Sequence, residues 1–428
     1  MRVQLDYGLD GLGVDLPEER TVVVAPRHVP ALADPAAALR DAIRRPGWGP
    51  SLASLAVLGA RVAISVCDIT RPQPRAAMLQ ALFAEMPQVS PADVTILVAT
   101  GTHRANTREE LEVMLGADIL ERYAVVNHNS RDAASLAFAG TTSAGVPIWL
   151  NRRWLDATLR ITTGFVEPHF FAGFSGGPKM VAPGLAGLET TLVLHDARHV
   201  GHRRATWGVT EGNPIHDDVR EIARLTGVHF ALDVALNRDQ QITRVFAGEL
   251  FAEHAAACAH VKATAMCPVD TLFDVVLTTN SGYPLDQNLY QSVKGMSAAA
   301  CIVKPGGTII CAAECRDGIP EHGPYGSILR ERPSPAALLE MIEAPGYSVP
   351  DAWQVQVQAL IQGKAEVLVK AGGLTLDALR AAHFEPVTDV AMAVRGALAK
   401  AGPDATLAVL PHGPQTIPYL AAPVTAGS

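Results

Sequence analysis

The chain is poor in charged and aromatic residues, which make up 18% and 5% of its 428 positions. Its formal net charge is -8 and it holds no run of basic residues, so it lacks the charge pattern of a nucleic-acid-binding protein. It has no apolar signal core and no uninterrupted apolar stretch long enough to cross a membrane, which predicts a cytoplasmic protein that does not bind membranes. Six cysteines are too few for a disulfide scaffold, so we expect reduced thiols.

Short runs rich in Val and Ile alternate with helical patterns along the chain. The runs that predict strands are 61–67, 93–99, 122–126, 159–163, 273–279, 307–311, 365–369 and 405–410, and helices are predicted at 75–85, 108–115 and 250–262. Continuously apolar strands separated by helices are typical of parallel sheets covered on both faces. The sequence therefore predicts an α/β fold of two doubly wound, Rossmann-like parallel-sheet domains. We expect an N-terminal cofactor-binding domain at 1–265, a C-terminal domain at 270–428, and the active site in the cleft between them.

Polar segments follow four of these strands. They are Asp68-Ile-Thr-Arg-Pro72, Ala99-Thr-Gly-Thr-His-Arg104, the segment from Gly164 through His169 to Lys179, and the segment from Asn280 through Tyr290 to Lys294. In open parallel sheets ligands bind beyond the carboxyl ends of the strands. One such segment could be a simple turn, but four together favour a ligand site.

Lys179 follows three glycines in Gly173-Phe-Ser-Gly-Gly-Pro-Lys179. Glycines let the backbone approach a phosphate or a flat cofactor closely. The segment is not a nucleotide-triphosphate loop, because Met180 stands where a magnesium-binding Ser or Thr is needed. A desolvated lysine can also attach a cofactor covalently. The alternative is a surface lysine after a glycine turn.

Three histidines, His195, His199 and His202, follow one another in a stretch that we predict to be helical, so His195 and His199 would share one face. Zinc proteases use this spacing, but Asp196 replaces the Glu that they need as a base. One of these rings is a candidate ligand for nickel or zinc. The residues alone leave open which one it is.

His103 and His169 each stand just beyond a strand, in a loop that contains glycine. Two histidines that face one carbon from opposite sides are what a racemase needs, because each must accept and return a proton near neutral pH. The alternative is two unrelated loop histidines.

A carboxylate could be held by Arg71 or Lys294, together with Gln291. Arg104 and Arg316 are rivals for this role, unless they only form surface ion pairs.

Together these segments resemble the nickel-pincer-dependent lactate racemase family of 2-hydroxy-acid racemases and epimerases. The matching segments keep the family's order and similar spacing over roughly residues 68 to 295. They are Asp68-x-Thr-Arg-Pro72, Gly101-Thr-His-Arg104, Pro168-His169, Ala172-Gly-Phe-Ser-Gly-Gly-Pro-Lys179, Pro183-Gly184, His195 and Tyr290-Gln-x-x-Lys294. Asp351-Ala-Trp353 resembles a weaker C-terminal signature that places a tryptophan over the site.

The resemblance implies a nickel-pincer nucleotide, a pyridinium-3,5-bisthiocarboxylic acid mononucleotide that binds nickel through carbon and sulfur. It implies attachment of this cofactor through Lys179, a nickel ligand in His195, and supply by cofactor-synthesis proteins. The residues that would contact the cofactor are Asp68, Ile69, Thr70, Arg71, Lys179 and His195.

The resemblance also implies that His103 and His169 alternate as acid and base while hydride moves between carbon 2 and the cofactor through a 2-keto acid. The substrate residues would be Arg71, Tyr290, Gln291, Lys294 and Trp353. The expected activity is inversion of carbon 2 in a lactate-like or larger 2-hydroxy acid. One alternative, an NAD-dependent 2-hydroxy-acid dehydrogenase, needs a GxGxxG directly after a strand, which the sequence lacks. The other, a non-catalytic nickel-cofactor binding protein, would have no use for the two histidines.

Overall fold

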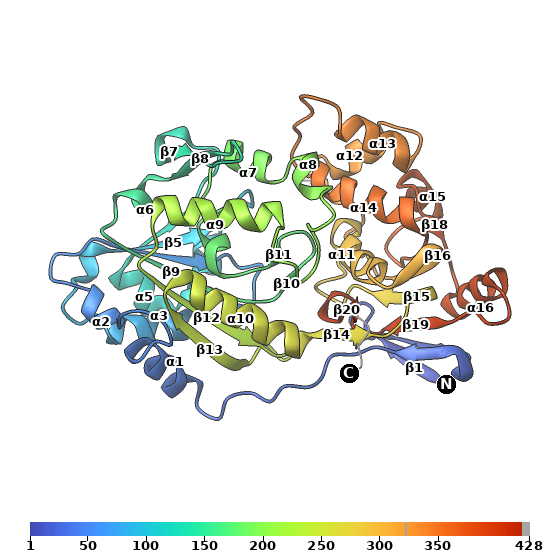
Figure 1. Ribbon diagram of the computed structural model, residues 1–428, viewed down its shortest axis with the longest axis horizontal. Coiled ribbons are helices and arrows are strands. Elements are labelled where there is room, and N and C mark those ends of the chain that lie inside the picture. Colours follow the sequence, from blue (N-terminus) through green and yellow to red (C-terminus); the bar gives the residue numbers. More distant parts are fainter. Residues whose placement is uncertain (322, 422–428) are drawn as a thin grey trace, which may run out of the picture. The chain divides into compact units, whose positions relative to one another are not determined.

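The structure is a computed structural model that describes residues 1–321 and 323–421 (Figure 1). The chain forms two compact units. The first, which we call the lysine unit because it contains Lys179, comprises His28–His195 and Arg204–Ala263. The second, the C-terminal unit, comprises Met1–Arg27, Asp196–Arg203 and the described residues from Thr264 onward.

The units differ from the expected division at 1–265 and 270–428, because two earlier segments belong to the C-terminal unit. Strand β3 (Thr21–Val23) pairs with β19 (Leu407–Leu410) as an edge strand of that unit's sheet. The hairpin of β1 (Arg2–Leu5) and β2 (Leu12–Asp15) buries its apolar side chains in the core beneath the same sheet. Sheet pairing at long range joins the N-terminus to the second half of the chain.

The lysine unit is built on a six-stranded sheet in the order β13-β12-β9-β4-β5-β6. All its neighbouring strands are parallel except the edge pair of β12 and β13. The strands are β4 (Val62–Cys67), β5 (Val94–Ala99), β6 (Ala124–Asn127), β9 (Leu159–Phe165), β12 (Phe230–Leu236) and β13 (Ile242–Gly248).

Helices cover both faces of this sheet, as its apolar strands predict. Along β4, Val62 and Ile64 belong to one buried cluster, and Ala63 belongs to another on the opposite face. The first cluster includes side chains of α1 (Pro35–Arg44), α3 (Arg75–Ala84), α4 (Arg108–Leu115) and α5 (Ala117–Arg122). The second includes side chains of α6 (Arg152–Asp156), α7 (Leu188–Leu194), α9 (Pro214–Thr226) and α10 (Leu250–Ala265). The hairpin of β7 (Leu136–Thr141) and β8 (Pro147–Asn151) completes this second face.

The strand order reverses between β4 and β9. From β4 the chain adds β5 and β6 on one side, and then β9 and β12 on the other. At such a switch point the loops after the two central strands diverge and leave room for a ligand. The segments after β4 and β9 contain Asp68 and the stretch from His169 to Lys179, so the topology places predicted site residues where this fold binds ligands.

The C-terminal unit is built on a parallel six-stranded sheet in the order β18-β17-β16-β15-β19-β3. Its other strands are β15 (Phe273–Thr279), β16 (Val303–Ala312), β17 (Glu366–Lys370) and β18 (Glu385–Pro386), and β14 (Met266–Val269) pairs separately with β20 (Ile417–Leu420). Its helices are α8 (Ala197–Val200), α11 (Leu289–Ala300), α12 (Tyr325–Leu329), α13 (Pro335–Ile342), α14 (Ala352–Lys364), α15 (Leu376–Ala381) and α16 (Val390–Ala401). The order here reverses between β15 and β19, and the segment from Asn280 to Lys294 follows β15.

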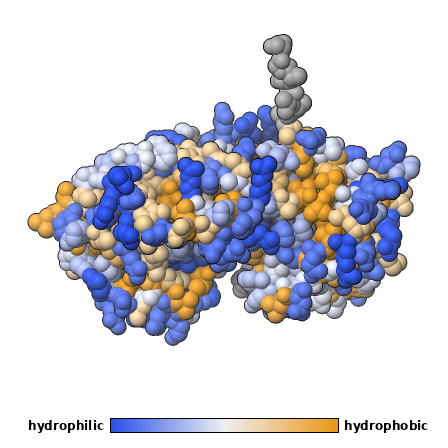
Figure 2. Space-filling model, turned by 90° about the horizontal axis from the view of Figure 1, so that it is seen from below, coloured by the Kyte–Doolittle hydropathy of each residue, from blue (hydrophilic) through white to orange (hydrophobic). Residues whose placement is uncertain are grey.

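The predicted α/β class with parallel sheets is confirmed. All six cysteines are free thiols, as expected. On the face shown in Figure 2, hydrophobic residues form small patches among hydrophilic ones. Within residues 1–321 and 323–421, no helix combines the length and apolarity that crossing a bilayer requires.

Candidate active site

His103 and Asp68 form a hydrogen-bonded pair beyond the carboxyl ends of neighbouring strands β5 and β4. Nδ1 of His103 lies 2.6 Å from Oδ2 of Asp68, and the side chains are 48% and 4% exposed. Burial opposes ionisation of Asp68, but the hydrogen bond and charge of His103, the Thr70 hydroxyl and the charge of Arg71 outweigh it and hold the pKa of Asp68 below its ordinary value. A carboxylate only accepts, so it fixes the proton on Nδ1 of His103 and leaves the lone pair on Nε2.

The turn after β4 is held by two side chains. Thr70 donates to Oδ1 of Asp68 from its hydroxyl at 2.6 Å and from its backbone N–H at 3.1 Å. The buried guanidinium of Arg75 donates to the backbone carbonyl of Asp68 and, at 2.5 Å, to that of Arg71. Ile69 and Arg71 are half-buried in this turn. The sequence did not single out Arg75, because nothing in a strand-to-helix turn marks an arginine that binds backbone carbonyls.

His169 lies in a two-residue strand, β10 (Pro168–His169), that pairs with β11 (Gly173–Phe174). Its Nδ1 accepts from the backbone N–H groups of Phe171 at 3.5 Å and Ala172 at 3.3 Å. Because Nδ1 is an acceptor here, the neutral ring carries its proton on Nε2. His169 and His103 thus have opposite tautomers.

Lys179 lies in a short 3-10 helix (Gly177–Met180) held close against α10. Gly176 and Gly177 have φ of +71° and +49°, which favours glycine. A Cβ on Gly177 would lie 2.4 Å from Cδ2 of His254 on α10, so no side chain fits there. The backbone N–H of Gly177 donates to Oδ2 of Asp233 at 2.7 Å. The glycines that suggested a cofactor loop therefore allow this loop to pack closely against His254 on α10 and against Asp233.

A buried pair of carboxyl groups, Asp233 on β12 and Glu253 on α10, lies beneath the lysine loop. Burial raises the pKa of Asp233 to about 7, against the opposing hydrogen bond from the backbone N–H of Gly177. Burial and then the charge of Asp233 raise the pKa of Glu253. An exposed Asp titrates near ~3.9. Between that pH and about 7 the folded protein retains a proton that the unfolded chain has lost, so the free energy of unfolding falls as the pH rises through this window.

The predicted helix through His195 and His199 is wrong. Helix α7 ends at Leu194, and α8 begins at Ala197. Asp196 interrupts the helix, because its Oδ1 accepts from the backbone N–H of His199 at 2.8 Å and thereby caps α8. His199 is buried with its Nδ1 2.7 Å from the same carboxylate. His195 and His199 therefore do not share a helix face.

His195 is the C-cap residue that directly follows α7. Its Nδ1 donates to the backbone carbonyl of Thr191 at 2.9 Å, and this places the lone pair on Nε2. A neutral imidazole with one nitrogen held by a carbonyl is the usual form of a metal-binding histidine. Of the three candidate histidines, His195 has this arrangement, whereas His199 is held by Asp196 and His202 is exposed.

The ring of Phe171 contacts three of the predicted site residues. The ring centroids of His169 and His195 lie 4.6 Å and 5.1 Å from its centroid, both edge-on. Nζ of Lys179 lies 5.9 Å from the same centroid. A buried aromatic ring thus gathers a candidate acid/base, a candidate metal ligand and a candidate tether. Sequence reasoning missed Phe171, because a phenylalanine in a loop of apolar residues indicates packing rather than chemistry.

The lysine unit fits the implied nickel cofactor in two respects. Among the described residues, no three His, Cys, Asp or Glu side chains are grouped so as to bind a metal without help. A single imidazole such as His195 suits a metal whose other ligands come from a bound cofactor. Lys179, half-buried and on the same aromatic ring, suits a covalent attachment.

The C-terminal unit places the remaining predicted residues on α11 and α14. Tyr290 and Gln291 are four and three residues from Lys294 on α11, so each lies near it on the helix surface. Nε1 of Trp353 donates to the Tyr290 hydroxyl at 3.3 Å, and that hydroxyl donates to Oδ1 of Asp351 at 3.4 Å. The weak C-terminal signature therefore contacts the Tyr290 motif directly.

The two rival arginines are engaged elsewhere. Arg104 donates to both carboxylate oxygens of Glu110, at 2.6 Å and 2.8 Å. Arg316 lies 2.7 Å from a carboxylate oxygen of Glu314. Each charge is matched by a near neighbour in the sequence, so the ion-pair alternative holds for both.

Known protein families match segments in both units of the chain. A family model of the lactate racemase N-terminal domain matches residues 7–208, and a model of the lactate racemase C-terminal domain matches residues 270–417. A lactate racemase of Thermoanaerobacterium thermosaccharolyticum is 33% identical over 423 residues, covering 97% of this chain and 98% of that protein. A lactate racemase of Lactiplantibacillus plantarum is 36% identical over 354 residues, covering 82% of this chain and 83% of that protein.

Solved structures give the same result. The lactate racemase apoprotein of Thermoanaerobacterium thermosaccharolyticum matches with a TM-score of 0.91 at 32% identity, over 98% of this chain and 100% of that chain. A Thermotoga maritima protein matches with a TM-score of 0.65 at 19% identity, over 86% of this chain and 96% of that chain, which shows a shared fold. The family named from the motifs, and with it the prediction of an isomerase, is confirmed: this chain belongs to the lactate racemase family.

Proposed function

We propose that the protein inverts carbon 2 of lactate or of a larger 2-hydroxy acid. The observation that carries this proposal is the pair of opposite tautomers at His103 and His169. His103, held by Asp68, presents a lone pair on Nε2. His169, held by two backbone N–H groups, presents an N–H on Nε2. Inversion needs one ring that takes the hydroxyl proton on Nε2 and another that gives an Nε2 proton to the substrate oxygen. The second ring would do so as an imidazolium, after taking up a further proton on Nδ1, and would then be left neutral.

The proposed cofactor is the nickel-pincer nucleotide, attached through Lys179 and with His195 as the protein ligand of nickel. When bound, this group supplies reversible hydride acceptance from carbon 2. The turn from Asp68 to Arg71 would contact the nucleotide, with Ile69 and Thr70. The glycines before Lys179 let the loop sit tightly on Asp233 and His254, which limits the positions that the tether can take.

The protein's own task is to bind the substrate and handle its proton. His103 Nε2 would take the hydroxyl proton, and Asp68 would stabilise the resulting imidazolium across the 2.6 Å hydrogen bond. Arg71, Gln291 and Lys294 would bind the substrate carboxylate, with Tyr290 and Trp353 beside it. Among the described residues, no carboxylate holds the side chain of Arg71 or Gln291 in the way that Glu110 holds Arg104 and Glu314 holds Arg316.

The nickel cofactor would be made by other proteins and supplied to this one. In this proposal His195 is the protein ligand of nickel and the nucleotide supplies the others, so nickel would arrive already bound to the nucleotide. We therefore propose cofactor-synthesis proteins as partners, and the cytoplasm, where such proteins would meet it, as the location.

The test is chiral chromatography of holoprotein produced together with cofactor-synthesis proteins. Pure D- and L-forms of lactate and of larger 2-hydroxy acids should each yield the opposite form. Replacing His103 or His169 by Ala should lower the rate in both directions by at least the ~10²–10⁴-fold typical of acid/base catalysis. Loaded protein that racemises none of the panel, or a variant that keeps the wild-type rate, would contradict the proposal.

A further inference from the structure

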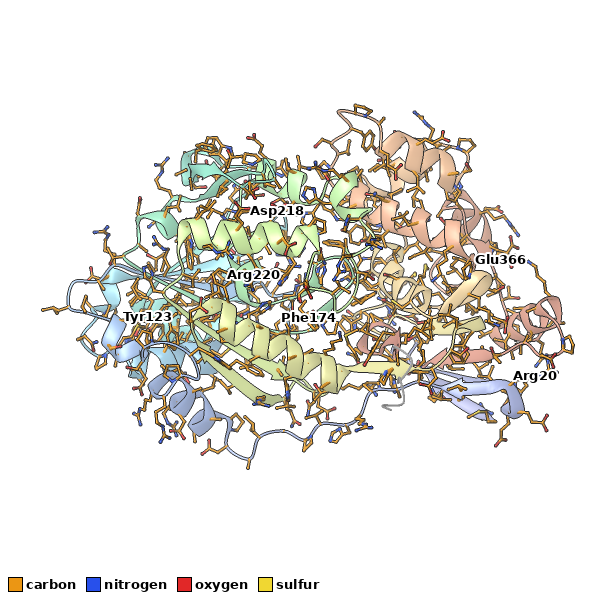
Figure 3. All side chains as sticks on the ribbon, viewed as in Figure 1. Arg20, Tyr123, Phe174, Asp218, Arg220 and Glu366 are labelled. Atoms are coloured by element: carbon orange, nitrogen blue, oxygen red, sulfur yellow. The ribbon has the colours of Figure 1, made fainter. Side chains whose placement is uncertain are left out.

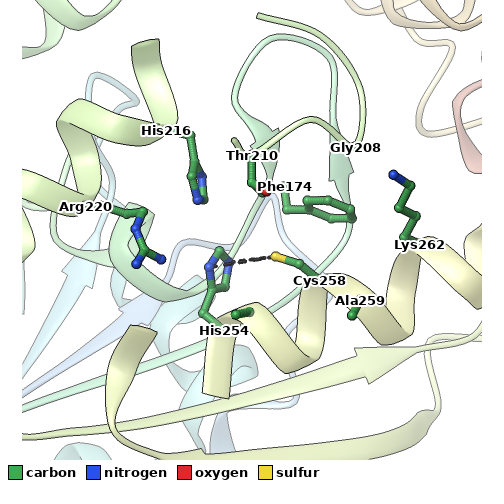
Figure 4. Close-up of a pocket in the computed structure, with 10 residues that line it drawn as sticks. Phe174, Gly208, Thr210, His216, Arg220, His254, Cys258, Ala259 and Lys262 are labelled. Atoms are coloured by element: carbon green, nitrogen blue, oxygen red, sulfur yellow. Dashed lines mark hydrogen bonds between the residues drawn. The ribbon is translucent and has the colours of Figure 1, made fainter. Parts of the chain in front are cut away.

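The lysine unit contains a cavity of about 220 Å³ that none of the proposed catalytic residues lines. Its walls come from α9, α10 and the segment 208–210 (Figure 4). The lining residues are Phe174, Gly208, Thr210, His216, Arg220, His254, Ala255, Cys258, Ala259 and Lys262. The volume is below the ~300–1,000 Å³ of pockets for drug-sized ligands, so the cavity suits a ligand of few atoms.

Arg220 supplies a positive charge to this cavity. It is half-buried on α9, and its guanidinium stacks on the ring of Phe251 at 4.6 Å. It makes no hydrogen bond or ion pair with any residue that the structure describes. The cavity lining contains no Asp or Glu, and Lys262 adds a second cation. Figure 3 shows Arg220 on α9 in the same part of the unit as Phe174. The charge here is therefore matched to an anion rather than to a cation.

His216 supplies a buried acceptor. It is 4% exposed, and its Nδ1 has no hydrogen-bond partner among the described residues. Burial, then the charges of His254, Arg220 and Lys179, lower the pKa of His216 to about 3, so the ring is neutral at neutral pH. A hydrogen bond to the backbone of Ala172 favours the charged ring, which means that a ring N–H is its donor. Because Nδ1 has no hydrogen-bond partner among the described residues, the donor is Nε2. Nδ1 therefore carries a lone pair that lacks a donor.

The remaining side chains do not make the cavity a metal site. Sγ of Cys258 lies 3.6 Å from Nε2 of His254, but burial raises the pKa of this thiol and so disfavours the thiolate that a metal needs. No trio of metal-binding side chains is found in the described parts of the chain. His254 instead hydrogen-bonds the backbone carbonyl of Ser175 at 2.9 Å, which ties the cavity wall to the lysine loop.

We propose that this cavity binds a small oxyanion that also carries a hydroxyl group. Arg220 would bind the charged oxygens, and the lone pair on His216 Nδ1 would accept the hydroxyl proton in a hydrogen bond, with Thr210 and Lys262 as further donors. A buried acceptor beside a cation rejects an anion that has no proton to donate, because the two lone pairs would face each other. Hydrogen phosphate and a free 2-hydroxy acid share this chemistry. In Figure 4 the side chains of His216 and Arg220 extend from α9 toward His254 on α10.

The test is calorimetric titration of the full-length protein, made without cofactor, with four anions at pH 7.5. Inorganic phosphate and lactate carry the hydroxyl, and sulfate and propionate are their counterparts without it. We expect at least one hydroxyl-bearing anion to bind at least tenfold more tightly than its counterpart. Binding of phosphate alone would identify a phosphate site, and binding of lactate alone would identify a second site for 2-hydroxy acids. Equal affinity for sulfate and phosphate together with equal affinity for propionate and lactate, or no binding at millimolar concentrations, would overturn the proposal.

Variants of one helix assign the binding to the cavity. Arg220→Gln should weaken binding of the favoured anion at least tenfold. Arg224→Gln is the matched control, because Arg224 stacks on the same Phe251 ring at 5.3 Å but is exposed and lies outside the cavity lining. Equal weakening in both variants would place the anion elsewhere and refute the assignment. Circular dichroism would verify that each variant is folded. The measurement uses no cofactor and no turnover, so its failure leaves the proposed racemase activity untouched.

Discussion

Replacing Asp68 by Asn tests whether the carboxylate sets the form of His103. Asn keeps the size of Asp, so it should preserve the turn after β4 and the 2.6 Å approach to Nδ1. It loses the negative charge, and its amide can donate to Nδ1 instead of accepting from it. That reversal would move the ring proton to Nε2 and remove the lone pair that the proposed base needs.

The expected loss follows from the contact itself. A hydrogen bond to a charged group contributes ~1.5–3 kcal/mol, which corresponds to about 10- to 150-fold in rate. His103 is 48% exposed, so solvent replaces part of that contribution and the lower end applies to loss of charge alone. Reversal of the tautomer adds to it, and in the serine-protease triad the same Asp-to-Asn change lowers kcat by about 10⁴-fold. We therefore expect kcat to fall at least tenfold, with a smaller change in KM.

Asp68→Ala separates the two causes, because it removes the charge and offers no donor. If the tautomer matters, Asp68→Asn should be at least as impaired as Asp68→Ala, although Asn is the closer substitute. Nickel content and cofactor mass would be measured on each variant, so that lost loading is not mistaken for lost catalysis. Asp274→Asn is the control, since this carboxylate binds Lys304 at 2.8 Å near the start of β15, away from the carboxyl ends of the strands. An Asn variant with near wild-type kcat would refute the reasoning.

Five further substitutions test other parts of the protein. Lys179→Ala should abolish a covalent cofactor adduct in intact mass spectra. His195→Ala should retain the adduct but lose nickel, whereas His199→Ala should retain both the adduct and nickel. Nickel loss in the His199 variant alone would reverse the ligand assignment. Lys294→Ala should raise KM and lower kcat, by about 10- to 150-fold in kcat/KM for one charge-assisted contact, and an unchanged kcat/KM would place Lys294 outside the site. In Asp233→Asn, thermal stability should fall less between pH 5.5 and pH 8 than it does in the wild type, because the amide needs no proton to remain neutral beside Glu253. A pH dependence equal to that of the wild type would show that Asp233 does not bind the extra proton.

Strand positions could be predicted because the strands are buried on both faces. The run at 61–67 is observed as Val62–Cys67, and the run at 273–279 is observed as Phe273–Thr279. Each contains consecutive apolar residues, which is typical of strands in parallel sheets that are covered on both faces. The order of strands, and so the switch points at β4 and β15, could not be predicted, because the sequence gives no measure of which strands pair. The pairing of β3 with β19 could not be predicted for the same reason.

Residues of the candidate site could be proposed from the sequence where a residue type carries its own chemistry. Lysine after glycines, and histidines after strands, are informative because few structural roles need them. Phe171 and Glu253 belong to the candidate site only because of the residues that they contact. Contacts between β12 and α10, or between two loops, cannot be predicted from neighbouring residues in the sequence. The break at Asp196 could have been expected, since Asp is a preferred N-cap residue, and here its carboxylate accepts from the backbone N–H of His199.

The tautomer of His169 leads to a last prediction, that this ring changes its hydrogen bonds during turnover. To act as a base in the reverse direction, Nε2 must lose its proton, and a neutral ring would then carry it on Nδ1, facing the backbone N–H groups of Phe171 and Ala172. Those contacts are long, at 3.5 Å and 3.3 Å, so they are weak and little is lost by breaking them. Phe170 stacks on the ring at 4.9 Å, which supports the ring from one side while its hydrogen bonds change. Nitrogen-15 spectra of histidine-labelled protein should show His169 protonated on Nε2 and His103 on Nδ1 at pH 8, with the His103 signal moving to the other tautomer in Asp68→Asn. Spectra that show the same tautomer for both rings in the wild type would remove the basis for complementary acid and base roles.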